Sequence, residues 1–329
     1  MTRGGFVRCV HEMNDRRTVE PLRRALAVVA LTALVAVFAL TACDDGPPSA
    51  TVGNAKPVKA SPGTDSAYPT YVALGDSYTA APGVPQTEQE SGCLRSNGNY
   101  ANLVANQLKS SFVDESCVGA STIALAGAQQ LNDRVQPPQF AALTPDTSLV
   151  TLGIGANDLK LLPTMVGTCG QFGLRDHDGS PCKDYMKDAG EDGKDLLVQK
   201  IDKVQGRLVK ALKAIHHRSP RAKVILVGYP QLIPAKKTCR ILPLAKDDYP
   251  YVRNLMVKLN DAMREAAKTA HATFIDVLEA SRGHDICAGR DAWVNGLNTD
   301  LMRALAFHPF AAEQQAVADL IMRKLDKKS

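Results

Sequence analysis

Short apolar runs alternate with longer amphipathic segments along most of this chain. The short runs are rich in β-branched residues and predict strands at residues 71–74, 111–113 (extending toward Cys117), 148–152, 223–227 and 273–277. The amphipathic segments have the period of helices and cover residues 100–109, 196–215, 252–270 and 311–325. Strands that alternate with helices indicate an α/β fold, in which a central parallel sheet of about five strands lies between two helical layers.

The N-terminal pattern is different, because one uninterrupted apolar run stands there. Residues 25–40 are apolar, follow two arginine pairs, and end at Leu40-Thr-Ala-Cys43. A basic region, a short apolar core and small residues before a cleavage site are typical of a secretory signal peptide, which we assign to residues 1–42. The run is shorter than the roughly 20 residues of a membrane span, and an uncut membrane anchor is the alternative.

The end of this run also resembles a bacterial lipobox, in which the cysteine carries a lipid and becomes the first mature residue. The resemblance implies lipidation at Cys43, and cleavage by a general signal peptidase is the alternative. Residues 43–68 are rich in Pro, Gly, Ser, Ala and Asp, so we expect the lipidated cysteine to be followed by a flexible tether. The globular part is then residues 69–329, which is long enough for one α/β domain with a substantial core.

Charge excludes one class of function. The full chain carries +5, but residues 1–42 contain six Arg and three acidic residues, so the remainder is close to neutral at +2. A nucleic-acid-binding domain is usually strongly basic on one face. We therefore expect no nucleic-acid partner.

Cysteine use favours an exported protein with disulfides. Of eight cysteines, Cys9 precedes the apolar run and Cys43 is assigned to the lipid, which leaves six in residues 69–329. An even number of cysteines in an exported chain indicates disulfides, and six cysteines allow several pairings. No Cys-x-x-Cys spacing supports the rival possibility, a metal site.

Four short blocks contain residue types that carry chemistry. Ser77 (in Gly-Asp-Ser-Tyr), Gly119 (in Cys-Val-Gly-Ala-Ser) and Asn157 (in Gly-Ala-Asn-Asp) each follow a predicted strand by a few residues. The fourth block is His308, in Phe-His-Pro, where the proline restricts the histidine to extended backbone. Open parallel sheets bind ligands beyond the carboxyl ends of their strands, so we expect the first three blocks to meet at one edge.

Together these blocks resemble the SGNH (GDSL-type) hydrolase family, which is built around Ser, Gly, Asn and His in this order. The resemblance covers most of residues 69–329 and implies a flavodoxin-like three-layer α/β/α sandwich and a serine ester hydrolase without cofactor or metal. It implies that Ser77 is the nucleophile and His308 the base. It also implies an oxyanion hole formed by the backbone N–H groups of Ser77 and Gly119 and by the Asn157 side chain.

The residue types suit this chemistry independently of the family. A serine hydroxyl needs a base that takes its proton when it attacks a carbonyl carbon. The oxyanion that develops needs donors that are already in place, and a side-chain amide can donate without adding charge.

One position departs from the family. The Asp that commonly stands three residues before the histidine is Leu305 here. Some secreted actinobacterial SGNH esterases use a main-chain carbonyl instead, which suffices because the third group chiefly orients the imidazole. We therefore predict a Ser77–His308 dyad in which the carbonyl of Leu305 accepts from His308. Asp300, the nearest upstream acid, is the weaker candidate.

The resemblance also bears on the cysteines. Secreted actinobacterial members of the family carry three sequential disulfides, which implies the pairs Cys93–Cys117, Cys169–Cys182 and Cys239–Cys287. Residues 168–194 contain the second pair and are rich in Gly, Asp and Lys, which predicts a long loop. Such a loop is either a flap beside the site or a tolerated surface insertion.

The sequence thus predicts an exported esterase or lipase. We expect it on the outer face of the cell membrane or in the cell envelope as a lipoprotein, or secreted, and as a monomer. Its substrate is an ester, expected to be lipid-like. An envelope-glycan deacetylase or acyltransferase and a non-catalytic binding lipoprotein are the alternatives.

Overall fold

The computed structural model describes residues 66–326, which belong to one compact unit. The predicted signal peptide at residues 1–42, Cys43 and nearly all of the predicted tether lie outside the described residues. No helix within residues 66–326 combines the length and the hydropathy needed to cross a bilayer.

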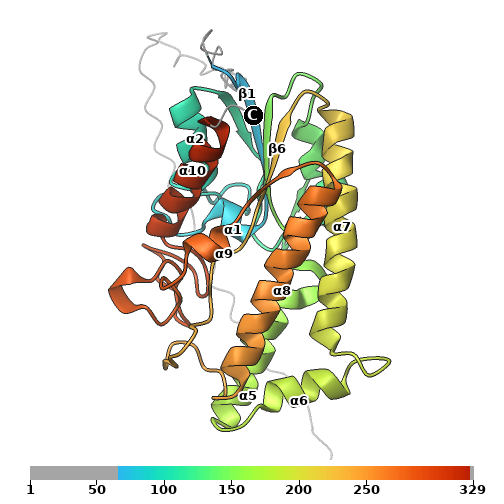
Figure 1. The fold of residues 1–329 in the computed structure, drawn as a ribbon. Coiled ribbons are helices and arrows are strands. Elements are labelled where there is room, and N and C mark those ends of the chain that lie inside the picture. Colours follow the sequence, from blue (N-terminus) through green and yellow to red (C-terminus); the bar gives the residue numbers. More distant parts are fainter. Residues whose placement is uncertain (1–65, 327–329) are drawn as a thin grey trace, which may run out of the picture. The chain divides into compact units, whose positions relative to one another are not determined.

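A five-stranded parallel sheet forms the centre of the fold, with the strand order β2-β1-β5-β6-β7 (Figure 1). Its strands are β1 (Thr70–Gly75), β2 (Ser111–Asp114), β5 (Leu149–Gly153), β6 (Lys223–Val227) and β7 (Thr273–Ile275). The chain leaves β1 toward β2 on one side and returns to β5 on the other. Such a reversal opens a crevice at the carboxyl ends of β1 and β5, where open α/β sheets bind ligands.

Four long helices cover the two faces of this sheet. They are α2 (Tyr100–Leu108) and α10 (Ala311–Asp326) on one face, and α7 (Leu196–Arg218) and α8 (Asp248–Thr269) on the other (Figure 1). The predicted three-layer sandwich is therefore confirmed.

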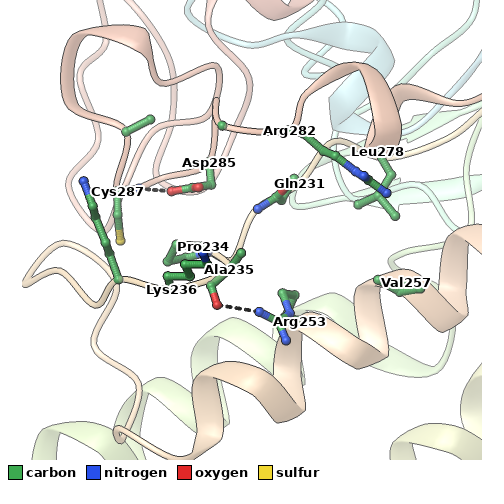
Figure 2. Close-up of a pocket in the computed structure, with 13 residues that line it drawn as sticks. Gln231, Pro234, Ala235, Lys236, Arg253, Val257, Leu278, Arg282, Asp285 and Cys287 are labelled. Carbon is green, nitrogen blue, oxygen red and sulfur yellow. Dashed lines mark hydrogen bonds between the residues drawn. The ribbon is translucent and has the colours of Figure 1, made fainter.

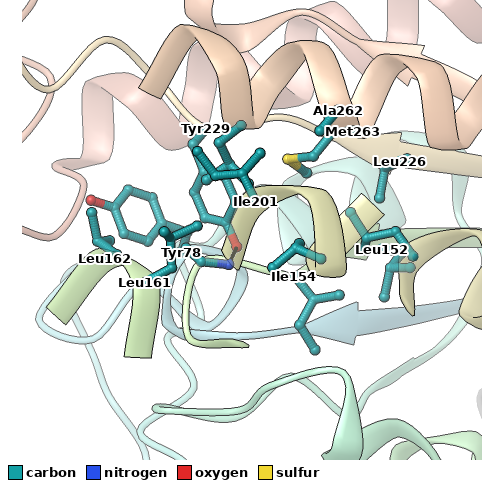
Figure 3. Close-up of a cluster of buried hydrophobic side chains, with 14 of the residues drawn as sticks. Tyr78, Leu152, Ile154, Leu161, Leu162, Ile201, Leu226, Tyr229, Ala262 and Met263 are labelled. Atoms are coloured by element: carbon teal, nitrogen blue, oxygen red, sulfur yellow. Dashed lines mark hydrogen bonds between the residues drawn. The ribbon is translucent and has the colours of Figure 1, made fainter. Parts of the chain in front are cut away.

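Alternate side chains of β1 pack into the two hydrophobic cores, one on each face of the sheet. Val72 and Leu74 belong to the larger core with α7 and α8, whereas Tyr71 and Ala73 pack with α2 and α10. Figure 3 shows part of the larger core, where side chains of β5 and β6 meet those of α7 and α8. Because both faces are covered, the central strands β1, β5 and β6 are mostly apolar, which is why they could be predicted from their composition.

Shorter elements connect these layers. A two-stranded hairpin consists of β3 (Gln129–Leu131) and β4 (Arg134–Gln136). The short helices are α1 (Ser77–Ala80), α3 (Ile123–Ala126), α4 (Leu161–Pro163), α5 (Cys169–Arg175), α6 (Pro181–Asp188) and α9 (Val277–Ala280). Single helical turns lie at η1 (Gln139–Ala142), η2 (Asp158–Lys160), η3 (Thr164–Thr168) and η4 (Gly289–Asp291).

The prediction of a loop over residues 168–194 is wrong, because this segment contains α5 and α6. The N-terminus of α6 is capped from a distant helix. The Asp248 carboxylate accepts hydrogen bonds from the N–H groups of Cys182 at 2.9 Å and Lys183 at 3.0 Å. A cap that comes from elsewhere in the chain leaves no local sequence pattern.

Two element boundaries also differ from the prediction. Helix α8 begins at Asp248 rather than at residue 252, since Pro250 lies in the first turn, where the missing N–H needs no partner within the helix. Strand β7 ends at Ile275 because Asp276 caps α9, accepting from the Glu279 N–H at 3.0 Å.

The structure forms the three predicted disulfides, Cys93–Cys117, Cys169–Cys182 and Cys239–Cys287. The first joins the segment after α1 to the segment after β2, the second joins α5 to α6, and the third joins the segments that follow β6 and α9. The first and third disulfides therefore tie together loops at the carboxyl edge of the sheet.

Candidate active site

Ser77 is the first residue of α1, directly beyond the carboxyl end of β1. Asp76 caps this short helix, and its carboxylate accepts from the Tyr78 N–H at 2.8 Å. Glycine is required at position 75, because a Cβ there would collide with the Thr79 side chain and lie 2.7 Å from the carbonyl oxygen of Gly153. This turn presents Ser77 at the edge of the sheet with 6 % of its surface exposed.

One small cavity brings three of the predicted site residues together. Ser77, Asn157 and His308 line a cavity of about 160 Å³. Its apolar wall consists of Ala156, Leu162, Pro163, Val166, Ala306 and Phe307. Within residues 66–326 the Ser77 hydroxyl makes no direct hydrogen bond to His308, so the two groups share the cavity without being paired. Such pairs often tighten only when substrate is bound.

Gly119 does not line this cavity, but its loop is tied to the neighbouring blocks. The Cys117 N–H donates to the Gly75 carbonyl at 3.0 Å, and the Asn157 side chain donates to the Ala120 carbonyl at 3.0 Å. Gly119 has a φ of +73°, in the left-handed region that favours glycine. The loop is therefore fixed between the strand that carries the serine and the predicted asparagine donor.

The three predicted oxyanion donors keep hydrogens for a ligand. Neither the Ser77 N–H nor the Gly119 N–H donates to another group among the residues that the structure describes. The Asn157 amide has two hydrogens and uses one of them on Ala120. Each group can therefore still donate to a bound anion.

A backbone carbonyl orients the His308 imidazole. Nδ1 of His308 lies 2.7 Å from the carbonyl oxygen of Ala306. Because a carbonyl oxygen can only accept, Nδ1 carries the proton and Nε2 keeps its lone pair. Burial lowers the pKa of His308, and the bond to Ala306 opposes this effect only in part. The imidazole is therefore neutral near pH 7 and its Nε2 can accept a proton.

The prediction that the Leu305 carbonyl plays this part is wrong. That carbonyl accepts from the His308 N–H at 3.2 Å and from Asn295 Nδ2 at 3.1 Å, so it closes a turn instead. Phe307 has a φ of +60° and redirects the chain there. As a result the carbonyl of Ala306, one residue later, meets the ring.

Asp300 does not orient the histidine either. It is exposed, and its carboxylate accepts from the Met302 N–H at 3.0 Å within a tight turn. A main-chain carbonyl thus holds the His308 imidazole, but it belongs to Ala306 and not to Leu305.

The GDSL-like Lipase/Acylhydrolase family matches residues 73–316, which include all four blocks. The chain belongs to this family. It is 36 % identical over 282 residues to Lipase 2 of Streptomyces coelicolor, an alignment that covers 84 % of this chain and 88 % of that protein. It is 30 % identical over 260 residues to an esterase of Streptomyces scabiei, with 70 % and 75 % covered. The prediction of a serine ester hydrolase is confirmed.

A solved structure shares the fold of this GDSL-family chain. The crystal structure of phospholipase A1 from Streptomyces albidoflavus NA297 matches with a TM-score of 0.61 at 24 % identity. The match covers 78 % of this chain and 100 % of that one. At this level of identity the likeness shows the fold, and it agrees with the sheet order and layers described above.

Two buried tyrosines connect the blocks of the GDSL-family site, and Figure 3 shows them beside each other. Tyr229, two residues beyond β6, donates to Asp76 Oδ2 at 2.5 Å and accepts from the Ala156 N–H at 3.0 Å. Its ring meets the ring of Tyr78 edge-on, with centroids 5.2 Å apart. Tyr229 therefore links the helix that begins with Ser77 to the loop that precedes the predicted asparagine donor.

Tyr78 extends this connection to the His308 segment. Its hydroxyl donates to the Phe307 carbonyl at 2.6 Å, and its ring stacks on the His308 imidazole with centroids 5.7 Å apart. Because Tyr78 directly follows Ser77, these contacts hold the histidine segment against the helix that carries the serine. Both tyrosines hold neighbouring loops in position. Each hydroxyl is already hydrogen-bonded within the protein and so is not free to bind substrate.

Asp158 joins two further blocks. This carboxylate is fully buried and accepts from the N–H of Thr122 at 2.8 Å, from the hydroxyl of Thr122 at 2.5 Å and from Arg207 of α7 at 2.7 Å. It therefore fixes the segment of Asn157 against the loop that contains Gly119 and against the helical layer.

Asp76, the residue before Ser77, has a raised pKa. Burial raises its pKa from 3.8 to about 7, and the hydrogen bonds from Tyr229 and from the Tyr78 N–H act in the opposite direction. It serves as a cap and as a hydrogen-bond acceptor rather than as a base, because both of its oxygens are occupied. Within residues 66–326, no group of three or more His, Cys, Asp or Glu side chains is placed to hold a metal ion.

Sequence reasoning missed the tyrosines and the role of Asp158. Tyr229 did leave a signal, since it follows the predicted strand at 223–227 by two residues and so belongs to the same edge as the other blocks. Tyr78 stands next to the predicted nucleophile. Their partners could not be inferred, because these depend on how deeply each ring reaches between loops.

Proposed function

We propose that this ester hydrolase acts through an acyl-enzyme on Ser77, with His308 as its base. The observation that supports the proposal most is their common cavity, together with the Ala306 carbonyl that holds the proton of His308 Nδ1. Nε2 takes the Ser77 proton as Oγ attacks the ester carbonyl, and returns it to the oxygen of the departing alcohol. Water then attacks the acyl carbon and gives a proton to Nε2, which returns it to Ser77 as the acid leaves.

The Ser77 N–H, the Gly119 N–H and the Asn157 amide stabilise the oxyanion in both steps. Their unused hydrogens and the fixation of the Gly119 loop by Asn157 support this role. Since these donors are held by backbone turns and by Asp158, they need little reorganisation when charge develops.

The acyl part of the ester lies in the cavity, against its apolar wall. Leu162, Pro163, Val166 and Phe307 offer no charge to an alkyl chain. A volume of about 160 Å³ corresponds to about five water molecules of liquid, which suits the first few carbons of an acyl chain. A longer, lipid-like chain then continues out of the cavity. The small volume also favours the second candidate, an envelope-glycan deacetylase, whose acyl group is an acetyl.

We also propose that the protein is exported, and that Cys43 carries a lipid that holds it at the membrane or envelope. The basic and apolar pattern of residues 1–42 and three disulfides in the described part support export. Replacing Cys43 with Ala in the full chain should release the protein into the medium. Retention of the Cys43→Ala variant in the membrane fraction would contradict lipid anchoring.

Hydrolysis of p-nitrophenyl esters from acetate to palmitate tests the catalytic proposal. The chain from residue 44 to 329 contains all described residues and should cleave these esters, whereas its Ser77→Ala variant should not. Ser180→Ala, in the turn before α6, is the matched control and should keep full activity. Activity on acetate alone would favour the deacetylase. Equal activity of the Ser77→Ala variant would refute Ser77 as the nucleophile.

A further inference from the structure

The surface beside the His308 segment is formed by two loops. Residues 235–241 lie between β6 and α8, and residues 297–303 lie between α9 and α10; both emerge on the same side of the fold (Figure 1). The loops meet where the Leu297 N–H donates to the Ile241 carbonyl at 2.9 Å. We call these two loops the docking face.

The docking face exposes apolar side chains. Leu301 and Met302 are the most exposed large apolar residues within residues 66–326, with 74 % and 78 % of their surface accessible. They stand at the tip of a turn that is closed by two hydrogen bonds between the Asp300 and Ala304 backbones, at 2.8 and 3.0 Å. Ile241 and Leu297 add exposed apolar surface where the loops meet. A cluster of this kind indicates a partner rather than a random surface.

The same two loops carry exposed cations. Lys236, Lys237 and Arg240 of the first loop and Arg303 of the second are all exposed, and Asp300 is the only acid in the two loops. The Arg303 guanidinium lies over the Phe310 ring, 4.5 Å from its centroid, and so stays beside the apolar tip.

A basic hollow adjoins the first loop. Its volume is about 550 Å³, and Figure 2 shows Lys236, Arg253 and Arg282 around it, with Val257 and Leu278 in its wall. Arg253 donates to the Ala235 carbonyl at 2.7 Å, which fixes this guanidinium at the rim. Lys237 also lines the hollow, and the one acid in its lining, Asp285, is 8 % exposed. Arg282 is paired with Glu279 at 2.6 Å, so Lys236, Lys237 and Arg253 extend the positive charge of the docking face into a concave site.

We propose that the docking face binds the surface of a bilayer that contains anionic phospholipids. Leu301 and Met302 enter the boundary between headgroups and acyl chains, while the lysines and arginines contact lipid phosphates there and in the hollow. A second copy of the chain fits less well. A two-fold contact would place the same cations against one another, because each patch then faces itself.

The docking face is continuous with the catalytic base. The Asn295 N–H donates to the His308 carbonyl at 2.9 Å, and the Ala306 N–H donates to Thr299 Oγ1 at 3.0 Å. Binding at this face therefore brings the cavity to lipid esters. The delivery of lipid esters to the cavity rests on the proposed hydrolysis. Binding of the docking face to a bilayer does not depend on that hydrolysis.

Sedimentation with lipid vesicles tests the proposal. The protein is the chain 44–329 with Ser77→Ala, so that no ester is consumed during the measurement. We expect it to bind vesicles of equal parts phosphatidylcholine and phosphatidylglycerol, to bind pure phosphatidylcholine weakly, and to be released by salt of about 0.5 M. Leu301→Asp/Met302→Asp and Lys236→Glu/Lys237→Glu should each lower the partition coefficient by about tenfold or more.

Matched controls separate the docking face from general effects. Val113→Asp changes an exposed valine on β2, and Lys203→Glu/Lys213→Glu reverses two exposed lysines on α7. Both controls should bind within about twofold of the parent. With Ser77 restored, the two docking-face variants should keep the kcat/KM of the parent on p-nitrophenyl acetate, which shows that the site is intact.

Three results would overturn the proposal. The first is that the parent does not bind anionic vesicles. The second is that the docking-face variants bind as well as the parent. The third is that the control variants lose as much binding as the docking-face variants. Anionic-lipid binding by a protein that hydrolyses no ester when Ser77 is present would leave the docking face standing and refute the proposed hydrolysis. Failure of the two ideas is thus distinguishable.

Discussion

Replacing Tyr229 with Phe removes one oxygen atom from the centre of the site and leaves the ring in place. This oxygen donates to Asp76 at 2.5 Å and accepts from the Ala156 N–H at 3.0 Å, and all three residues are buried. Each buried group that loses its partner costs about 1–3 kcal/mol, and a charged group costs more. We therefore expect the free energy of unfolding to fall by about 3 kcal/mol at pH 9, where Asp76 is ionised.

The Tyr229→Phe variant should lose less free energy of unfolding at low pH. Asp76 has a folded-state pKa of about 7, against 3.8 when unperturbed, and the Tyr229 hydrogen bond is one of the influences that lower it. Without that bond the folded-state pKa rises further, while the unfolded-state pKa is unchanged. A raised folded-state pKa favours folding below the unfolded-state pKa, and this contribution is lost as the pH rises through the folded-state pKa. The variant therefore loses additional stability above about pH 7, and at pH 5 the free energy of unfolding should fall by about 2 kcal/mol, about 1 kcal/mol for each buried group.

Thermal unfolding of the chain 44–329 at both pH values measures the difference. For a chain of this size, 1 kcal/mol shifts the Tm by about 2–4 °C, so we expect a drop of about 6–12 °C at pH 9 and about 4–8 °C at pH 5. Burial also raises the pKa of Glu313, to about 8, but this carboxyl is common to both proteins and cancels in the comparison.

Tyr251→Phe is the matched control for this variant. The Tyr251 hydroxyl donates to Asp195 at 2.6 Å, between α8 and the cap of α7, so the control removes the same kind of contact outside the cavity. It should keep the kcat of the parent, whereas Tyr229→Phe should lower kcat because the loops around Ser77 loosen. Equal Tm losses at pH 5 and pH 9 in the Tyr229 variant would refute the link to Asp76.

The other predictions concern the reaction itself. Asn157→Ala should lower kcat by about 10²–10³, as expected for one oxyanion donor; an unchanged kcat would remove Asn157 from the oxyanion hole. Because His308 must be neutral to accept a proton and burial lowers its pKa from 6.5, kcat/KM should fall with decreasing pH only below pH 6.5, and an acidic limb above that value would contradict this base. Asp300→Asn should leave kcat nearly intact, and a thousandfold loss would show that this acid, not the Ala306 carbonyl, orients the imidazole.

The fold was predictable because its central strands are buried on both faces. The run at residues 149–153 is apolar except for Thr151, and the helices that cover it carry a clear helical period. The segment 168–194 was not predictable in this way. Its polar composition suggested a loop, but the Asp248 carboxylate on α8 supplies the hydrogen-bond acceptor that its second helix needs.

Only those site residues that directly follow a strand could be placed from the sequence. Ser77 and Asn157 follow β1 and β5, which are neighbours in the sheet, so their convergence follows from topology. The carbonyl that contacts His308 could not be predicted from topology. Whether the carbonyl of Leu305 or Ala306 meets His308 depends on the left-handed conformation of Phe307, and a phenylalanine gives no sign of a positive φ.

The tyrosines show where this limit lies. The periodicity of a strand tells which side chains arrive at an edge of the sheet, and Tyr229 arrives there as clearly as the serine does. It does not tell which of the neighbouring groups each side chain contacts, because that depends on the directions of loops that differ by single residues. Tyr229 bonds to Asp76 rather than to the neighbouring Ser77, and Tyr78 reaches Phe307, 229 residues away. The local sequence therefore shows which residues reach this edge of the sheet, whereas the contacts that hold the His308 segment near Ser77 form only in the folded chain.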